Sequence, residues 1–210
     1  MTQRLVLRRG VVVAVERPGP AAELLVEVDG AQRRAISYEA MTGPAEPGDE
    51  VVVNTAAVDL GLGSGGFDVV HVNLTRGLRG TGVDGAHVMK ANYTSLQHAV
   101  VPVEEQAGAL ERPLGKPVAV TFLHGQLPCV AWQAAQARPH ARIGFVQTAG
   151  GALPGELSRT VADLTERGLI AGHITAAAAF GGGHEAISTA GGLHAGLTVL
   201  GWDAAIAGPG

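Results

Sequence analysis

The sequence contains few cysteines, few aromatic residues and no long apolar run. Cys129 is the one cysteine among 210 residues, so no internal disulfide can form and secretion into an oxidising compartment is not indicated. The run Val11–Val15 is too short for the apolar core of a signal peptide. No segment approaches the roughly 18 apolar residues that a membrane span requires. These absences predict a cytoplasmic protein without a membrane-spanning segment.

Charged residues are also scarce, at 16% of the chain, and the net charge is -4. A mildly acidic chain argues against nucleic-acid binding. Aromatic residues make up only 4%, so valine, alanine, leucine and isoleucine must build the core. Glycine is abundant instead, with 31 residues, about twice its usual frequency. The glycines cluster at the ends of apolar runs, which indicates loops.

Short apolar strands separated by turn residues dominate the first part of the chain. We expect strands over residues 4–16, 24–28, 33–38, 50–54 and 67–73, and extended segments over 87–92 and 96–103. Asp29-Gly30, between two of these strands, is a strong hairpin signal. Closely spaced strands without helical periodicity predict a small antiparallel β-barrel or sandwich over residues 1–103, with no helix within residues 4–54.

A glycine cluster interrupts this first part. Gly61, Gly63 and Gly66 match the G-x-G-x-x-G pattern of dinucleotide-binding proteins, and Asp84 follows at a plausible distance for a ribose contact. That pattern requires a helix that opens at the glycines and faces the pyrophosphate. Here residues 67–73 favour a strand, so a glycine-rich turn or bulge is the better interpretation.

The hydrophobic period changes after a linker predicted over residues 104–116. Strands are expected over 117–123, 142–147, 173–180 and 203–207, and helices over 128–136, 156–167 and 185–200. This alternation predicts a parallel, Rossmann-like α/β sheet over residues 117–210. The chain stops directly after a strand, so we expect this domain to be truncated at its C-terminus. An uncovered apolar sheet would make the chain unstable or prone to associate, and an oligomer is therefore one expectation.

Ligands of open α/β sheets bind outside the carboxyl ends of the strands. The loops that follow the predicted strands are rich in glycine, and glycine loops before helices expose N–H groups that suit an anion. The alternative is that such loops need glycine in any case. The ligand-binding candidates on these loops are Gln126, Thr148, Gly150, Gly151, Gly181, Gly182 and Gly183.

Three residues of the same loops are candidates for catalysis. His184 and Glu185 are predicted to open the third helix, where His184 could act as a general acid or base and Glu185 could simply favour the helix dipole. His124 could join them. The three could also hold a metal, but no H-E-x-x-H or paired-cysteine spacing supports that. Cys129 is more plausibly a small buried residue than a reactive thiol. Walker A and G-x-S-x-G motifs are both missing.

The segments VVVNTAAVDLGLGSGGFDVVHVN, GAHVMKANYTSLQ, AFGGGHEA and AIAGPG resemble a bacterial family known only as a domain of unknown function. The resemblance covers nearly the whole chain and implies members that extend past this C-terminus. It implies no activity, and Ser64 stands where members often have threonine. Its characteristic positions are Asn54, Asp59, Gly61, Gly63, Gly66, His87, Lys90, Tyr93, Thr94 and Gln97.

Two functions remain open at this point. The first is an α/β enzyme that acts on a small anionic metabolite, with an unknown cofactor. The second is a scaffold that senses a ligand or binds a protein, and RNA binding by the barrel is a third hypothesis. We also expect the glycine cluster and residues 87–97 to face the α/β domain and complete one site. The residues that would bind the ligand there are Gly61, Gly63, Ser64, Gly66, His87 and Lys90.

Overall fold

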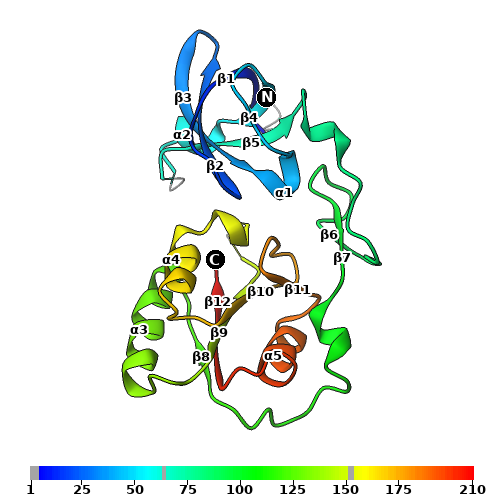
Figure 1. The fold of residues 1–210 in the computed structure, drawn as a ribbon, viewed down its shortest axis with the longest axis vertical. Helices are drawn as coiled ribbons and strands as arrows, with labels where there is room; N and C mark the ends of the chain where they lie inside the picture. The colour runs from blue at the N-terminus through cyan, green and yellow to red at the C-terminus, as the bar shows by residue number, and fades with distance from the viewer. Residues whose placement is uncertain (1–4, 63–64, 151–153) are drawn as a thin grey trace. The chain divides into compact units, whose positions relative to one another are not determined.

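The computed structural model describes residues 5–62, 65–150 and 154–210. The chain divides into two compact units, Met1–Thr81 and Gly82–Gly210, which are drawn in Figure 1. We describe each unit by itself. Residues 82–103, which the sequence groups with the barrel, belong to the second unit. No helix within the described residues is long and apolar enough to cross a membrane.

Unit 1 is a closed five-stranded barrel with the strand order β1-β2-β3-β5-β4. The strands are β1 (Leu7–Arg17), β2 (Ala21–Val28), β3 (Ala31–Tyr38), β4 (Glu50–Asn54) and β5 (Asp68–Asn73). Every predicted strand of this region is present. The Asp29-Gly30 hairpin is confirmed, since both residues have positive φ, 51° and 80°, as a type I′ turn requires. The inward side chains are mostly valine, alanine and leucine.

Two features of unit 1 correct the sequence predictions. The barrel is not wholly antiparallel, because β3 and β5 run parallel and pair at Ala35 and Asp68. A one-turn helix, α1 (Glu39–Thr42), also lies within residues 4–54, where none was expected. Two further short helices are α2 (Ala56–Asp59) and the 3-10 helix η1 (Gly77–Arg79). Helices of one turn carry too little periodicity to be found in a sequence.

Unit 2 contains a five-stranded sheet with the order β11-β10-β9-β12-β8, and all of its strand pairs are parallel. Its strands are β8 (Val118–Val120), β9 (Ile143–Thr148), β10 (Gly172–Ala176), β11 (His184–Ala186) and β12 (Ala204–Pro209). Its α-helices are α3 (Leu127–Ala137), α4 (Arg159–Glu166) and α5 (Thr189–Thr198). The predicted parallel sheet is thus confirmed. The helix expected from residue 185 begins only at Thr189, and the strand β11 takes its first residues.

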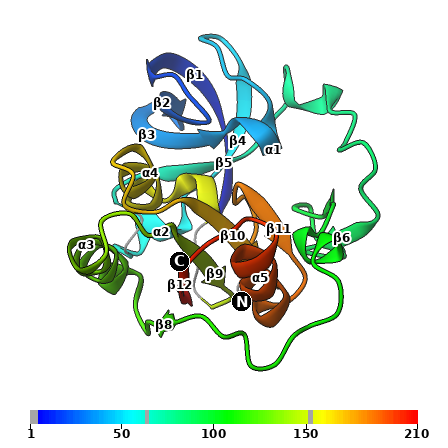
Figure 2. The same cartoon turned by 60° about the horizontal axis from the view of Figure 1, so that its bottom comes forward.

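Helices cover both faces of the sheet. Figures 1 and 2 show α3 and α4 on one side and α5 on the other. Alternation along β9 explains this: Phe145 packs in the core of α3 and α4, whereas Val146 packs in the core of α5. The second core is centred on Trp202, which is 1% exposed. Its ring lies on Gly144 and Gly196, where a Cβ would come within 2.0 and 2.4 Å of ring atoms.

A small hairpin completes unit 2. It is formed by β6 (Val88–Lys90) and β7 (His98–Val100), which pair antiparallel. The 3-10 helix η2 (Val103–Gln106) follows it and supplies Val103 to the α5 core. Glu104 accepts from the N–H groups of Ile187 and Ser188 just before α5. The predicted linker therefore begins with residues that pack on the α/β core.

The strand β8 forms an edge of the sheet and is flanked by exposed apolar side chains. Val120, Phe122 and Leu123 are 70, 82 and 66% exposed, and residues 118–123 contain no charge. Such an edge favours association between chains. We expect sedimentation velocity to show concentration-dependent association, which Phe122→Glu reduces. A monomer at all concentrations would contradict this prediction.

Candidate functional site

A histidine and a serine meet at the carboxyl edge of the sheet in unit 2. His124 begins the 3-10 helix η3 (His124–Gln126) after β8, and Ser158 is the N-cap residue of α4. His124 Nε2 lies 2.9 Å from Ser158 Oγ, and His124 Nδ1 lies 3.3 Å from the carbonyl oxygen of Pro209. A carbonyl oxygen only accepts, so in the neutral ring Nδ1 carries the proton and Nε2 accepts from the serine hydroxyl.

Ser158 is fixed by the start of α4. Its Oγ accepts a hydrogen bond from the Val161 N–H at 3.2 Å, and the residue is 5% exposed. A hydroxyl has two lone pairs and one proton, so Ser158 can cap the helix and donate to His124 at the same time. The sequence predicts this helix from Glu156 onward, so the role of Ser158 as its N-cap was not predicted. Ser158 is of a residue type favoured at the N-cap and stands three residues before Val161, the first apolar residue of the helix, and this spacing is the signal that identifies it.

A second histidine lies beside this pair. His173 stacks on Phe145 with a ring separation of 5.3 Å, and its Nε2 lies 3.0 Å from Gln147 Oε1. Burial, and then the neighbouring His124, lower the pKa of His173 from its ordinary 6.5 to about 4. His173 is therefore neutral at physiological pH, and it donates its Nε2 proton to the amide oxygen. His173 therefore lines the site as a side chain fixed by stacking and a hydrogen bond. The sequence did not predict this residue.

The low pKa of His173 makes stability depend on pH. Between pH 6.5 and about 4 the unfolded chain binds a proton at this residue, whereas the folded chain does not. The contribution of neutral His173 to the free energy of unfolding is thus complete above pH 6.5 and is lost as the pH falls to about 4. It amounts to about 3 kcal/mol, from 1.36 kcal/mol per pKa unit. Urea unfolding at pH 7.5 and 4.5 should show a weaker pH dependence for His173→Gln than for wild type. The same change in free energy of unfolding between the two pH values for wild type and His173→Gln would contradict the prediction. His140→Gln, which changes an exposed histidine, is the control.

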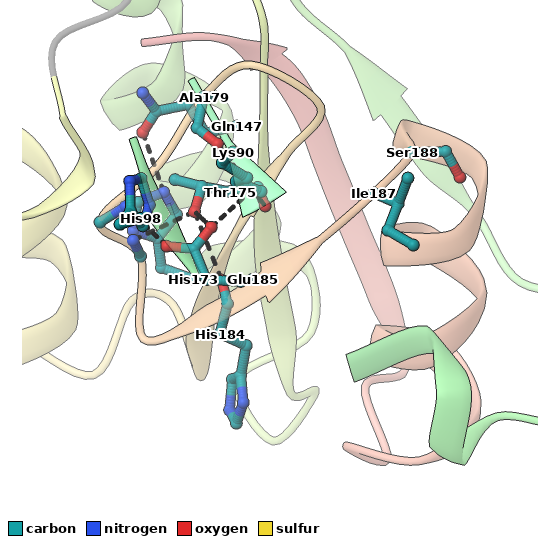
Figure 3. Close-up of polar contacts among 12 residues, drawn as sticks. Lys90, His98, Gln147, His173, Thr175, Ala179, His184, Glu185, Ile187 and Ser188 are labelled. Carbon is teal, nitrogen blue, oxygen red and sulfur yellow. Dashed lines mark hydrogen bonds and ion pairs between the residues drawn. The ribbon is translucent and has the colours of Figure 1, made fainter. Parts of the chain in front are cut away.

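An ion pair between the buried Lys90 and the partly buried Glu185 forms the second polar cluster of unit 2 (Figure 3). Lys90, 4% exposed, donates to Glu185 Oε2 at 2.5 Å and to the carbonyl oxygens of Thr175 and Ala179 at 2.9 and 2.7 Å. The Thr175 hydroxyl also donates to Glu185 Oε2, at 2.8 Å. An ammonium group has three N–H donors. Lys90 therefore uses all of its donors within the protein and has none left for an anionic ligand.

The loop candidates near β11 are placed differently from the prediction. His184 and Glu185 lie in a strand and not at the opening of a helix. His184 is exposed, and Figure 3 shows its ring directed away from Lys90 and Glu185. The N–H of Gly181 donates to Glu185 Oε1 and that of Gly182 to Thr175 Oγ1. These N–H groups support the loop itself, and Gly183 follows them just before the strand.

The remaining candidates of the carboxyl edge lie on two loops. Gln126 Oε1 accepts from the N–H groups of Phe122 and Leu123, so this amide stabilises the turn that carries His124. Thr148 ends β9 and pairs with Pro209 of β12, and Gly150 follows with a φ of 118°. Gly151 lies outside the described residues. Thr148 and His124 thus flank the end of the same strand, β12.

The glycine cluster belongs to unit 1. Gly61 and Gly66 have positive φ, 65° and 81°, and lie between the one-turn helix α2 and the strand β5. Gly63 and Ser64 lie outside the described residues. A strand follows the cluster, as predicted, so the helix that a dinucleotide fingerprint requires does not open there. The shared site of the cluster with residues 87–97 stays a prediction.

The hairpin residues that the family resemblance singles out mostly contact one another. Tyr93 N–H donates to Gln97 Oε1, and the Thr94 hydroxyl donates to the Ala91 carbonyl oxygen. His87 lies before the hairpin, where hydrogen bonds to the Gly85 carbonyl and then to Glu105 raise its pKa. These residues shape the turn. Lys90 is the hairpin residue whose side chain reaches the sheet.

Cysteine and metal chemistry can also be judged from the described residues. Cys129 is exposed and not buried, which corrects the prediction. It lines a groove of about 410 Å³ between α3 and α4, together with Trp132 and Leu164. Within the described ranges no three His, Cys, Asp or Glu side chains are grouped closely enough to hold a metal ion. His124, His184 and Glu185 therefore do not form a joint ligand set.

A family described as a protein of unknown function (DUF3866) matches residues 34–210. No curated protein matches the chain, and no solved structure matches it.

Proposed function

The chain belongs to this family of proteins of unknown function, and since the family brings no activity, we propose from the geometry of unit 2 that it is an enzyme with a serine nucleophile. Ser158 would be the nucleophile and His124 its general base. The carrying observation is the 2.9 Å contact between His124 Nε2 and Ser158 Oγ, with His124 Nδ1 oriented by the Pro209 carbonyl. A nucleophile, a base and a group that orients the base define such sites by geometry and not by sequence motif.

The chemistry follows from these contacts. Ser158 Oγ attacks a carbonyl carbon while its proton passes to His124 Nε2. The imidazolium then gives that proton to the leaving group as the bond between carbon and leaving group breaks. Water, deprotonated by the same nitrogen, attacks the acyl group on Ser158 and releases a carboxylic acid. The Pro209 carbonyl accepts from Nδ1 and keeps the ring in place throughout.

The topology supports this location. The sheet order β11-β10-β9-β12-β8 contains, counted from β9, the run 3-2-1-4 that also occurs in Rossmann-like sheets, while β8 lies beyond β12. The order reverses between β9 and β12, and α5 lies on the face opposite to α4. In such sheets ligands bind outside the carboxyl ends of the strands at this point. His124 contacts the end of β12 there, which favours a ligand site at the Ser158–His124 pair.

The proposed substrate is a small acyl ester or thioester. The N-terminus of α4 lies at Ser158, and the positive end of a helix dipole stabilises negative charge. It would favour both the oxyanion that forms on attack and an anionic group of the substrate. Of the three catalytic candidates of the sequence, His124 has a role in this reaction. His184 and Glu185 are left out because the one points to solvent and the other is held by Lys90.

A covalent probe tests the proposal without knowledge of the substrate. The protein is incubated with a fluorophosphonate, which modifies activated serines, and the site is identified by peptide mass. We expect one modified residue per chain, Ser158, and no modification of Ser158→Ala. Thr165→Ala is the matched control, since it removes another hydroxyl from α4. An unmodified Ser158 in wild type would contradict the proposal and leave the scaffold as the better interpretation.

A further inference from the structure

The loop between β10 and β11 is unusually short for a connection between two parallel neighbouring strands. These two strands are parallel neighbours, yet only residues 177–183 connect them, whereas such a connection normally takes a dozen or more residues. The backbone shows the effect: Ala177 and Gly181 have positive φ, 53° and 78°. Ala177 lacks the freedom of glycine, so the surroundings must hold this conformation.

Polar side chains of the strand–hairpin cluster hold the loop from one side. Lys90 donates to the carbonyl oxygen of Ala179, Glu185 accepts from the N–H of Gly181, and Thr175 accepts from the N–H of Gly182. Lys90 and Glu185 are joined to each other at 2.5 Å. Three backbone groups of the loop, at Ala179, Gly181 and Gly182, are thus hydrogen-bonded to one charged cluster.

The other side of the loop supports the turn that carries Ser158. The Phe180 carbonyl accepts from the Gly155 N–H at 2.7 Å, and the Gly155 carbonyl accepts from the Ser158 N–H at 3.1 Å. The packing leaves no space, because a Cβ on Gly155 would lie 2.5 Å from His173 Cε1 and 2.6 Å from the Gly181 carbonyl oxygen. A displaced loop must therefore displace Gly155, and with it Ser158 and the wall formed by His173.

The hairpin β6–β7 contacts the loop at a second residue. His98 of β7 contacts the ring of Phe180 edge to face, with a centroid separation of 5.2 Å. Lys90 and His98 are also paired across the hairpin. Two neighbouring side chains of the hairpin thus contact Ala179 and Phe180, which are consecutive residues of the loop.

From these contacts we infer that Lys90 is a positioning residue for Ser158. It acts through Ala179, Phe180 and Gly155, and the inference rests on the proposed role of Ser158. Lys90 touches neither Ser158 nor His124 in this chain of contacts. Its effect is to keep Ser158 Oγ within hydrogen-bond distance of His124 Nε2.

The test combines Lys90→Met with Glu185→Gln, so that no unpaired charge is left in the interior. Hydrogen exchange of the Gly155 amide, which donates to Phe180, should become at least about 10-fold faster, while the Val146 amide of the core keeps its wild-type rate. The rate of Ser158 modification by the fluorophosphonate should fall at least about 10-fold. Lys116→Met is the matched control, because Lys116 also donates to two backbone carbonyls, those of Leu197 and Trp202.

The outcomes separate the two claims. Gly155 exchange in the double variant equal to that of Lys116→Met would overturn the positioning role. So would accelerated exchange with an unchanged rate of Ser158 modification. If wild-type Ser158 does not react with the probe, the proposed function fails, and Gly155 exchange alone then decides whether Lys90 fixes the turn. Should the double variant not fold, Glu185→Gln alone is measured, and Gly155 exchange equal to wild type overturns the inference.

Discussion

Replacing His124 by glutamine is expected to slow the reaction of Ser158 with a fluorophosphonate at neutral pH by at least about 100-fold. Glutamine can keep a hydrogen bond to Ser158 but cannot accept its proton, so the serine loses its base. The reason lies in the 2.9 Å contact between Nε2 and Oγ. The second-order rate constant, measured by intact mass over time, gives the effect directly.

The pH profile provides the internal check on this variant. In wild type the rate should fall where the His124 ring is protonated, because only a neutral imidazole can take up the serine proton, and His124→Gln should lack this dependence. His140→Gln, which changes an exposed histidine, should keep both the rate and the profile. Equal rates for wild type and His124→Gln would show that the imidazole does not activate Ser158.

Replacing Trp202 by alanine is expected to lower the free energy of unfolding of unit 2 by about 3–5 kcal/mol. The indole fills the space between β9 and α5, and Gly144 and Gly196 lie directly against it. Both glycines are part of regular elements and cannot move to close the cavity. Urea unfolding monitored by circular dichroism measures the change.

Trp132 of α3 supplies the matched control, since it is 50% exposed whereas Trp202 is 1% exposed. Trp132→Ala should change the free energy of unfolding by less than about 1 kcal/mol, because little buried surface is lost. Gly144→Ala should itself be strongly destabilising, because its Cβ would overlap the indole. Destabilisation by Trp202→Ala no larger than by Trp132→Ala would contradict the assigned core.

The sequence predicted the regular parts of the fold because their signals are local. Valine-rich strands and the Asp29-Gly30 turn carry their conformation in neighbouring residues, and the parallel sheet follows from strand and helix alternation. In the segment 177–188, local signals no longer predict the structure. Glu185 suits the first turn of a helix, so the sequence favoured a helix there. Its carboxylate instead pairs with Lys90, 95 positions earlier, and Ser188 caps a helix that starts later.

The site could be predicted only in part for the same reason. His124 was identifiable because it follows an apolar strand, where α/β proteins bind ligands. Ser158 was missed because the helix start was placed at Glu156, three residues before the observed start at Arg159. The sequence also could not predict that Lys90 uses all of its N–H donors within the protein. Two of its acceptors are backbone carbonyls that only the folded loop brings to it.

The claim that His124 activates Ser158 is tested most directly by measuring which nitrogen of the His124 ring carries the proton. A long-range proton–nitrogen correlation spectrum of the histidine rings, assigned with His124→Gln, reports which nitrogen carries the proton. We predict that the neutral ring carries its proton on Nδ1, directed at the Pro209 carbonyl, and has a lone pair on Nε2 that accepts from Ser158. A proton on Nε2 would contradict the account, because Ser158 would then accept from His124 and could not be activated by it.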